Sequence, residues 1–106
     1  RPNVLMFGDG AWIPHRTHGQ QARFDAWFRA IQEEGRRLLV VELGAGTAIA
    51  TIRWASERLG AGPDARVVRM TPREAQIAEP HLSIAAGALE GLAAVEAALG
   101  APPVAP

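Results

Sequence analysis

The stretch Leu38–Thr51, LLVVELGAGTAIAT, decides the fold predicted for this chain. It opens with a run of aliphatic residues, which is typical of a strand buried on both faces of a parallel sheet. Gly44 and Gly46 follow, and glycines let the backbone turn tightly without placing a side chain between it and a ligand. A helix is expected to begin near Thr47, and its unpaired N–H groups would suit a phosphate or a carboxylate. The stretch therefore predicts a nucleotide-binding turn.

The composition indicates one folded domain. The chain has 106 residues, 48% of them hydrophobic, and a formal net charge of zero. Such a chain can form one core, and this composition argues against disorder and against nucleic acid as the main partner. It has no cysteine, which excludes a disulfide or a thiolate metal site within it. No apolar stretch approaches the ~20 residues of a membrane span, so we expect no membrane partner and a cytoplasmic location.

Apolar periodicity predicts about four strands and about three helices. The expected strands are Asn3–Gly8, Arg37–Leu43, Arg66–Met70 and His81–Ala85, and the expected helices are His18–Glu34, Thr47–Leu59 and Gly87–Leu99. Strands that alternate with helices predict a three-layer α/β domain with a largely parallel sheet. We expect this single domain over residues 1–99, followed by a mobile Pro/Ala tail over residues 100–106.

The spacing of apolar residues also predicts which face of each helix packs inward. The first helix presents Phe24, Trp27, Phe28 and Ile31, the second Ile49, Ile52 and Ala55, and the third Leu89, Leu92, Val95 and Leu99. Arg53 and Glu57 are expected to face solvent on the second helix.

The carboxyl ends of parallel strands are where such sheets bind ligands. The turns Gly8-Asp9, Gly44–Thr47, Thr71–Arg73 and Ala86–Gly87 would all fall near that edge. Arg69 and Arg73 flank the end of the third expected strand, where they either meet phosphates or are solvated. His15 and His18 are three residues apart, but no third ligand lies within reach in the sequence, so we predict no metal site.

The glycine turn departs from the simple dinucleotide fingerprint GxGxxG. Its third glycine is replaced by Ile49, and no acidic residue ends the next strand, where Met70-Thr71-Pro72 stands. One alternative is a non-catalytic α/β module whose glycine turn binds a nucleotide or other small phosphate compound, or whose glycines serve packing alone. Another is the first motif of class I S-adenosylmethionine-dependent methyltransferases, which VVELGAGT resembles. In that family the motif lies on the first strand, whereas here it lies on the second expected strand.

Four segments in order resemble the C-terminal half of the sirtuins, the NAD-dependent protein deacylases. They are RPNVLMFGD, LLVVELGAGT, RVVRMTPRE and HLSIAAGALEGL. The resemblance covers nearly all of the chain and implies a partial Rossmann-like (DHS-like) NAD-binding fold. Because the chain begins at Arg1 and a strand pattern follows at once, we expect it to be the C-terminal part of a longer protein.

The resemblance also implies roles for individual residues. Phe7, Gly8 and Asp9 match a Phe-Gly-Glu segment that lies beside the acyl-lysine peptide in the family. Gly44, Ala45, Gly46 and Thr47 take the place of a Gly-Thr-Ser turn that contacts NAD, with Thr47 supplying one hydroxyl. Thr71 stands where the family has an asparagine that holds the adenosine ribose, Arg73 lies close by, and Ala86 and Gly87 occupy the turn beside adenine. NAD or ADP-ribose is therefore the expected ligand.

Other family features are absent: the N-terminal Gly-Ala-Gly loop, the Gln-Asn-x-Asp segment, the catalytic histidine and the zinc-binding cysteines. We therefore expect the isolated chain to be inactive and to carry no catalytic residue of its own. The missing half would also leave Asn3–Gly8 and Leu38–Leu43 with exposed apolar edges. Either these two strands pair directly, or the chain self-associates through an open edge.

Overall fold

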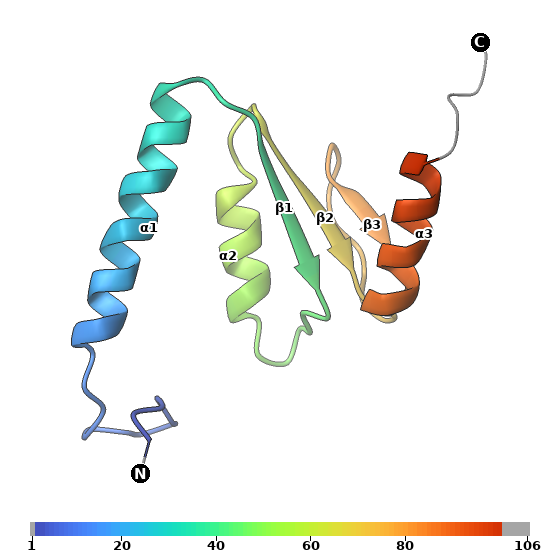
Figure 1. The fold of residues 1–106 in the computed structure, drawn as a ribbon. Coiled ribbons are helices and arrows are strands. Elements are labelled where there is room, and N and C mark those ends of the chain that lie inside the picture. Colours follow the sequence, from blue (N-terminus) through green and yellow to red (C-terminus); the bar gives the residue numbers. More distant parts are fainter. Residues whose placement is uncertain (1, 101–106) are drawn as a thin grey trace. The chain divides into compact units, whose positions relative to one another are not determined.

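The structure, a computed structural model, describes residues 2–100, which divide into two compact units. The first unit ends at Arg36 and contains helix α1 (His15–Glu33). The second begins at Arg37 and contains every strand and the other two helices (Figure 1). Of the tail expected at residues 100–106, residues 101–106 lie outside the described residues, whereas Gly100 is the last residue of helix α3 (Ala88–Gly100).

The second unit is an α/β structure with a parallel sheet of three strands. They are β1 (Leu38–Leu43), β2 (Ala65–Met70) and β3 (Leu82–Ile84), in the order β1-β2-β3. Leu38 pairs with Ala65 and Leu43 with Met70, so β1 and β2 are in register over their whole length. The carboxyl ends of the strands, and the turns that follow them, therefore meet at one edge of the sheet.

The first expected strand, Asn3–Gly8, was wrong, since this segment forms no strand. Among residues 2–14, the Asn3 side chain donates to Ile13 O (2.8 Å) and accepts from Ile13 N (3.0 Å), and Asp9 N donates to Met6 O (3.1 Å). Gly8 has a positive φ of 68°, which ends any extended backbone there. Of the two alternatives, direct pairing of this segment with β1 is therefore not present, and β1 is an edge strand in the described part of the chain.

Helices α2 (Thr51–Leu59) and α3 cover opposite faces of the sheet (Figure 1). A Cβ at Gly60, just after α2, would overlap Val67, and a Cβ at Gly91 of α3 would overlap Met70. Side chains alternate along a strand, so Val67 and Met70 of β2 point to opposite faces. The two glycines thus mark where each helix approaches the sheet most closely.

The predicted inward faces of these two helices were wrong. On α2 the buried residues are Arg53 and Ser56, whereas Ile52 is 59% exposed. On α3 the buried residue is Gly91, and the expected leucine stripe is exposed at Leu89, Leu92 and Leu99. Arg53 faces inward because its guanidinium donates hydrogen bonds to loop carbonyls. Helix α3 packs through Gly91 because a larger residue there would overlap Met70.

Helix α1 begins at His15, directly after Pro14, and not at the predicted His18. Proline suits a helix start because its fixed φ is already helical. Gly35, with φ 65°, follows shortly after the end of the helix. The aromatic stripe is present, with Phe24 and Trp27 ring centroids 5.6 Å apart, but no residue of α1 is buried. Within residues 2–100, no helix has the length and apolar character needed to cross a membrane.

Candidate functional site at the carboxyl edge of the sheet

The glycine turn after β1 begins with a residue whose backbone conformation strongly favours glycine. Gly44 has φ 64°, a conformation that L side chains rarely adopt, and its N–H donates to Met70 O at the end of β2 (2.9 Å). No atom lies within 4 Å of a Cβ built at Gly44 or Gly46, so both leave open space beside the backbone. Ala45 between them is buried at 8% exposure and anchors the turn.

The helix after this turn begins later than predicted. Turn residues separate Thr47 from α2, whose first residue is Thr51 and whose N-cap is Ala50. The unpaired N–H groups at the helix start therefore do not directly follow the Gly-Ala-Gly-Thr segment. We expected a phosphate site in which the glycine turn leads directly into a helix. The structure does not have this arrangement, because turn residues lie between Thr47 and α2.

Arg53 of α2 ties the first two loops of the edge together. It is only 8% exposed, and it donates from Nη1 to Ala45 O (3.0 Å) and from Nη2 to Glu74 O (2.8 Å). The buried guanidinium thereby satisfies two loop carbonyls and fixes the distance between the loops after β1 and β2. This role explains why a residue expected in solvent faces inward.

Glu74 carries an exposed carboxylate at this edge. Its Oε2 accepts a hydrogen bond from Thr47 Oγ1 (2.8 Å), across the two loops. Glu74 also has φ 56°, an uncommon conformation for a residue with a side chain. Strained backbone often accompanies functional positions, because the surrounding contacts hold it there. Here the contact from Arg53 to the Glu74 carbonyl does so.

The loops after β2 and β3 meet beside the first turn. Thr71 is 7% exposed and its N–H donates to Ile84 O (3.2 Å), while Ser83 Oγ donates to Ala75 O (2.6 Å). Ala86 N donates to Ile84 O (3.0 Å), and Gly87 directly precedes α3. The turns named from the sequence, Gly44–Thr47, Thr71–Arg73 and Ala86–Gly87, therefore follow three adjacent parallel strands.

The two arginines considered for phosphate binding differ in their surroundings. Arg69 is 2% exposed, and its guanidinium is bonded to Glu42, Glu57 and Gln76 O, so it is not available to a ligand. Its hydrogen bond to Glu42 raises the pKa of Arg69 further above its ordinary value. Arg73 is exposed and has no hydrogen bond or ion pair to any residue between 2 and 100. Arg73 is thus the arginine that an anion at this edge would meet.

Glu42 is the buried acid beneath the site. Burial alone would raise the pKa of its carboxyl, but hydrogen bonds from Arg69 and Ser56 and the nearby Arg53 charge outweigh burial, so the pKa is lowered. Glu42 is therefore ionised at neutral pH and paired with Arg69 within the sheet.

Phe7, Gly8 and Asp9, the expected peptide-binding residues, belong to the first unit. Phe7 is 94% exposed, and Asp9 Oδ1 accepts from Ala11 N (3.1 Å) in a turn. His15 and His18 lie on the first turn of α1. Among residues 2–100, no three His, Cys, Asp or Glu side chains are grouped as a metal site would require.

Two residues of this edge, Arg53 and Glu74, were not predicted from the sequence. Glu74 follows Thr71 by three positions, so the sequence does show an acidic residue shortly after β2. Its contact with Thr47 depends on the fold. No protein-family model, curated protein or solved structure matches the chain.

Proposed function

We propose that the carboxyl edge of the sheet binds the ADP-ribose part of NAD, as the C-terminal NAD-binding portion of a sirtuin-like protein deacylase. The observation that carries this proposal is the hydrogen bond between Thr47 and Glu74. A carboxylate near the end of the second strand of such a sheet is well placed to accept the two ribose hydroxyls of a nucleotide. The glycine turn beside it leaves open space against the backbone.

The charge at the same edge supports a ligand that contains phosphate. Arg73 adjoins Glu74 in the sequence and has no partner within the described residues, so its guanidinium is free for a diphosphate. Arg53 cannot serve in this way, because loop carbonyls already occupy its Nη1 and Nη2. A ribose on Glu74 and a diphosphate on Arg73 together describe ADP-ribose.

The proposed role is binding without catalysis by this chain alone. The histidine and cysteines that the resemblance assigns to catalysis and zinc binding have no counterpart here. In the complete protein the acyl-lysine substrate would lie near Phe7, Gly8 and Asp9. These residues enter the proposal through the resemblance only.

Two observations favour an S-adenosylmethionine-dependent methyltransferase-like domain as the second candidate. Since Asn3–Gly8 is not a strand, the glycine motif follows the first strand of the sheet, as it does in that family. Glu74 also supplies an acid shortly after the next strand. Both cofactors contain adenosine, so the ribose site suits either. The free Arg73 favours the diphosphate of NAD, because S-adenosylmethionine has no phosphate.

Ligand titrations of the whole chain, followed by backbone amide NMR, test these proposals. Shifts at Gly44–Thr47 and Glu74 with NAD and ADP-ribose would support the first candidate. Shifts with S-adenosylmethionine alone would replace it by the second, and no shift with any of the three would contradict both.

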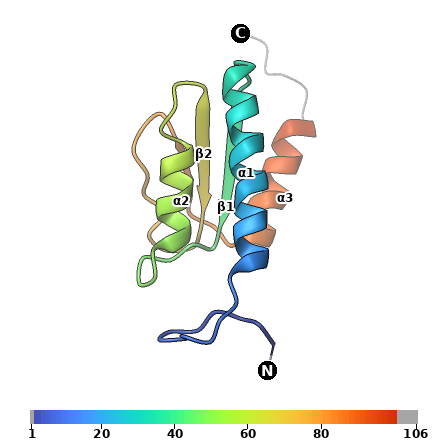
Figure 2. The same ribbon diagram turned by 90° about the vertical axis from the view of Figure 1, so that its left-hand side faces the viewer.

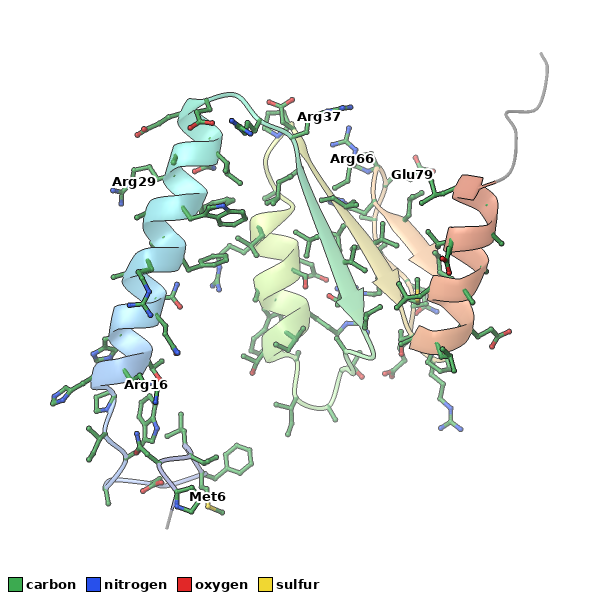
Figure 3. The ribbon with its side chains drawn as sticks, in the orientation of Figure 1. Met6, Arg16, Arg29, Arg37, Arg66 and Glu79 are labelled. Carbon is green, nitrogen blue, oxygen red and sulfur yellow. The ribbon has the colours of Figure 1, made fainter. Side chains whose placement is uncertain are left out.

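A matched pair of variants locates the ribose. Glu74→Gln should weaken ADP-ribose binding about 10-fold or more, since a hydrogen bond to a charged group contributes about 1.5–3 kcal/mol. Glu79→Gln is the control, because Glu79 is exposed in the same loop but lies toward the opposite end of the sheet (Figure 3). Equal weakening by both variants would mean that Glu74 has no specific role.

A further inference from the structure

Strand β1 is an open edge of the sheet. It pairs with β2 on one side and with no other strand among residues 2–100 (Figures 1 and 2). Leu38 N donates to Asp64 O and Gly44 N donates to Met70 O, so the even-numbered residues of β1 face β2. Backbone groups alternate in direction along a strand. The N–H and C=O groups of Leu39, Val41 and Leu43 therefore point outward from the free edge.

The side chains of these three residues are also uncovered. Leu39 is 61% exposed, Val41 48% and Leu43 44%. They share one face of the sheet, and no charged side chain interrupts them. Natural edge strands usually carry a charge, a proline or a bulge that blocks pairing with another chain. Here the one charged residue of β1, Glu42, points to the other face and is neutralised by Arg69.

From this geometry we infer that a second copy of this chain pairs with β1, antiparallel, about a two-fold axis through Val41. In that register Val41 faces its own counterpart and Leu39 faces Leu43 of the other copy. All outward N–H and C=O groups of the three residues are then paired, and every cross-strand pair on that face is aliphatic. The sheet becomes continuous, with the order β3-β2-β1-β1-β2-β3.

Neighbouring registers fit less well. An axis through Val40 would place Leu43 opposite Arg37, and an axis through Glu42 would bring two carboxylates together. With the axis at Val41, Arg37 of each copy lies opposite Ala45, far from the other Arg37. The strand is thus self-complementary in one register, as a two-fold interface requires.

The contact formed by this pairing is small. A pairing confined to one six-residue strand falls in the class of small interfaces, below about 1,200 Å². Such interfaces are transient, so we infer a reversible dimer that forms as concentration rises. This inference does not depend on any ligand at the carboxyl edge.

Sedimentation of the whole chain from micromolar to near-millimolar concentration is the first test. We expect a monomer–dimer equilibrium that Val41→Lys and Val41→Pro both abolish. The Val41 N–H does not bond to β2, so the proline removes an outward donor only. Leu82→Lys, on the opposite edge strand β3, is the control and should leave the dimer intact. A monomer at every concentration, or a dimer lost only with Leu82→Lys, would overturn the inference.

Two further measurements fix the register and do not require a destabilising variant. Because the chain has no cysteine, Val41→Cys introduces a single thiol. Facing Val41 residues would have Cα atoms about 5.5 Å apart, within disulfide range, so mild oxidation should link the copies. Leu39→Cys should not link, because its counterpart lies about 14 Å away.

Hydrogen exchange of the unaltered chain gives the second measurement. The amides of Leu39, Val41 and Leu43 should gain protection as concentration rises, while those of Val40 and Glu42 are protected throughout. Linking by Leu39→Cys alone, or protection independent of concentration, would contradict the proposed pairing.

Discussion

Arg69 of β2 lies directly opposite Glu42 of β1 and binds it with two hydrogen bonds, Nε to Oε1 at 2.5 Å and Nη2 to Oε2 at 3.1 Å. Both side chains are closed off from solvent, at 2% and 0% exposure. Glu57 of α2 adds a third contact to the same guanidinium, at 3.0 Å. The buried guanidinium of Arg69 therefore joins β1, β2 and α2, at a position where aliphatic side chains would ordinarily pack.

Arg69→Met should destabilise the chain by about 3–5 kcal/mol, because it leaves Glu42 buried and ionised without its partner. Replacing both residues, Glu42→Leu with Arg69→Met, should recover most of that loss, since an apolar pair of similar volume needs no charge compensation. Urea unfolding followed by circular dichroism measures both. A double variant as unstable as the single one would show that the pair supplies more than charge balance.

The lowered pKa of Glu42 predicts acid sensitivity. The stabilisation from its ionised form is complete above the ordinary carboxyl pKa of 4.5 and is lost as the pH falls through the lower folded-state value. The free energy of unfolding should therefore decrease on acidification below that point. The Glu42→Leu, Arg69→Met double variant lacks this group, so its unfolding should depend less on pH over the same range. An equal pH dependence in both proteins would assign the effect to other acids.

Gly60→Ala should destabilise the chain by about 1–3 kcal/mol, the usual effect of overpacking. The new methyl group would overlap Val67, which is fully buried, and would approach Ser56 O at 3.2 Å. Gly62→Ala is the matched control, because its Cβ meets nothing within 4 Å. Thermal unfolding compares them, and equal melting temperatures would mean that α2 shifts freely on the sheet.

Arg53→Met should loosen the loops after β1 and β2. The variant leaves the Ala45 and Glu74 carbonyls without their donors, so the amides of Gly44–Thr47 and Glu74 should exchange faster. If Glu74 holds a ribose, ADP-ribose binding should weaken as well. Arg58→Met, an exposed arginine on the same helix, is the control. Unchanged exchange in Arg53→Met would show that the loops are held without it.

The parts of the fold predicted correctly were those that short-range patterns encode. The aliphatic run and the glycine turn predicted β1 and its end, and the segment RVVRM predicted most of β2. The segment Asn3–Gly8 misled the prediction, because an apolar run alone does not distinguish a strand from a turn. Its outcome depended on the side chain of Asn3 reaching Ile13, ten residues away.

In the candidate site, too, the local turns could be predicted from the sequence and the long-range contacts could not. The turns at Gly44–Thr47, Thr71–Arg73 and Ala86–Gly87 could be assigned to one edge from the alternation of strands and helices. Glu74 and Arg53 could not, because their contacts join residues 27 and 21 positions apart.

The sequence by itself determined that this chain is α/β, where its main strands lie, and that a glycine turn follows β1. Local backbone preferences and apolar runs are sufficient for that. Only the tertiary structure decided that arginines occupy the space beneath α2 and that the leucines of α3 remain exposed. A buried charge is stable only if its partners are in place, and those partners come from distant parts of the chain.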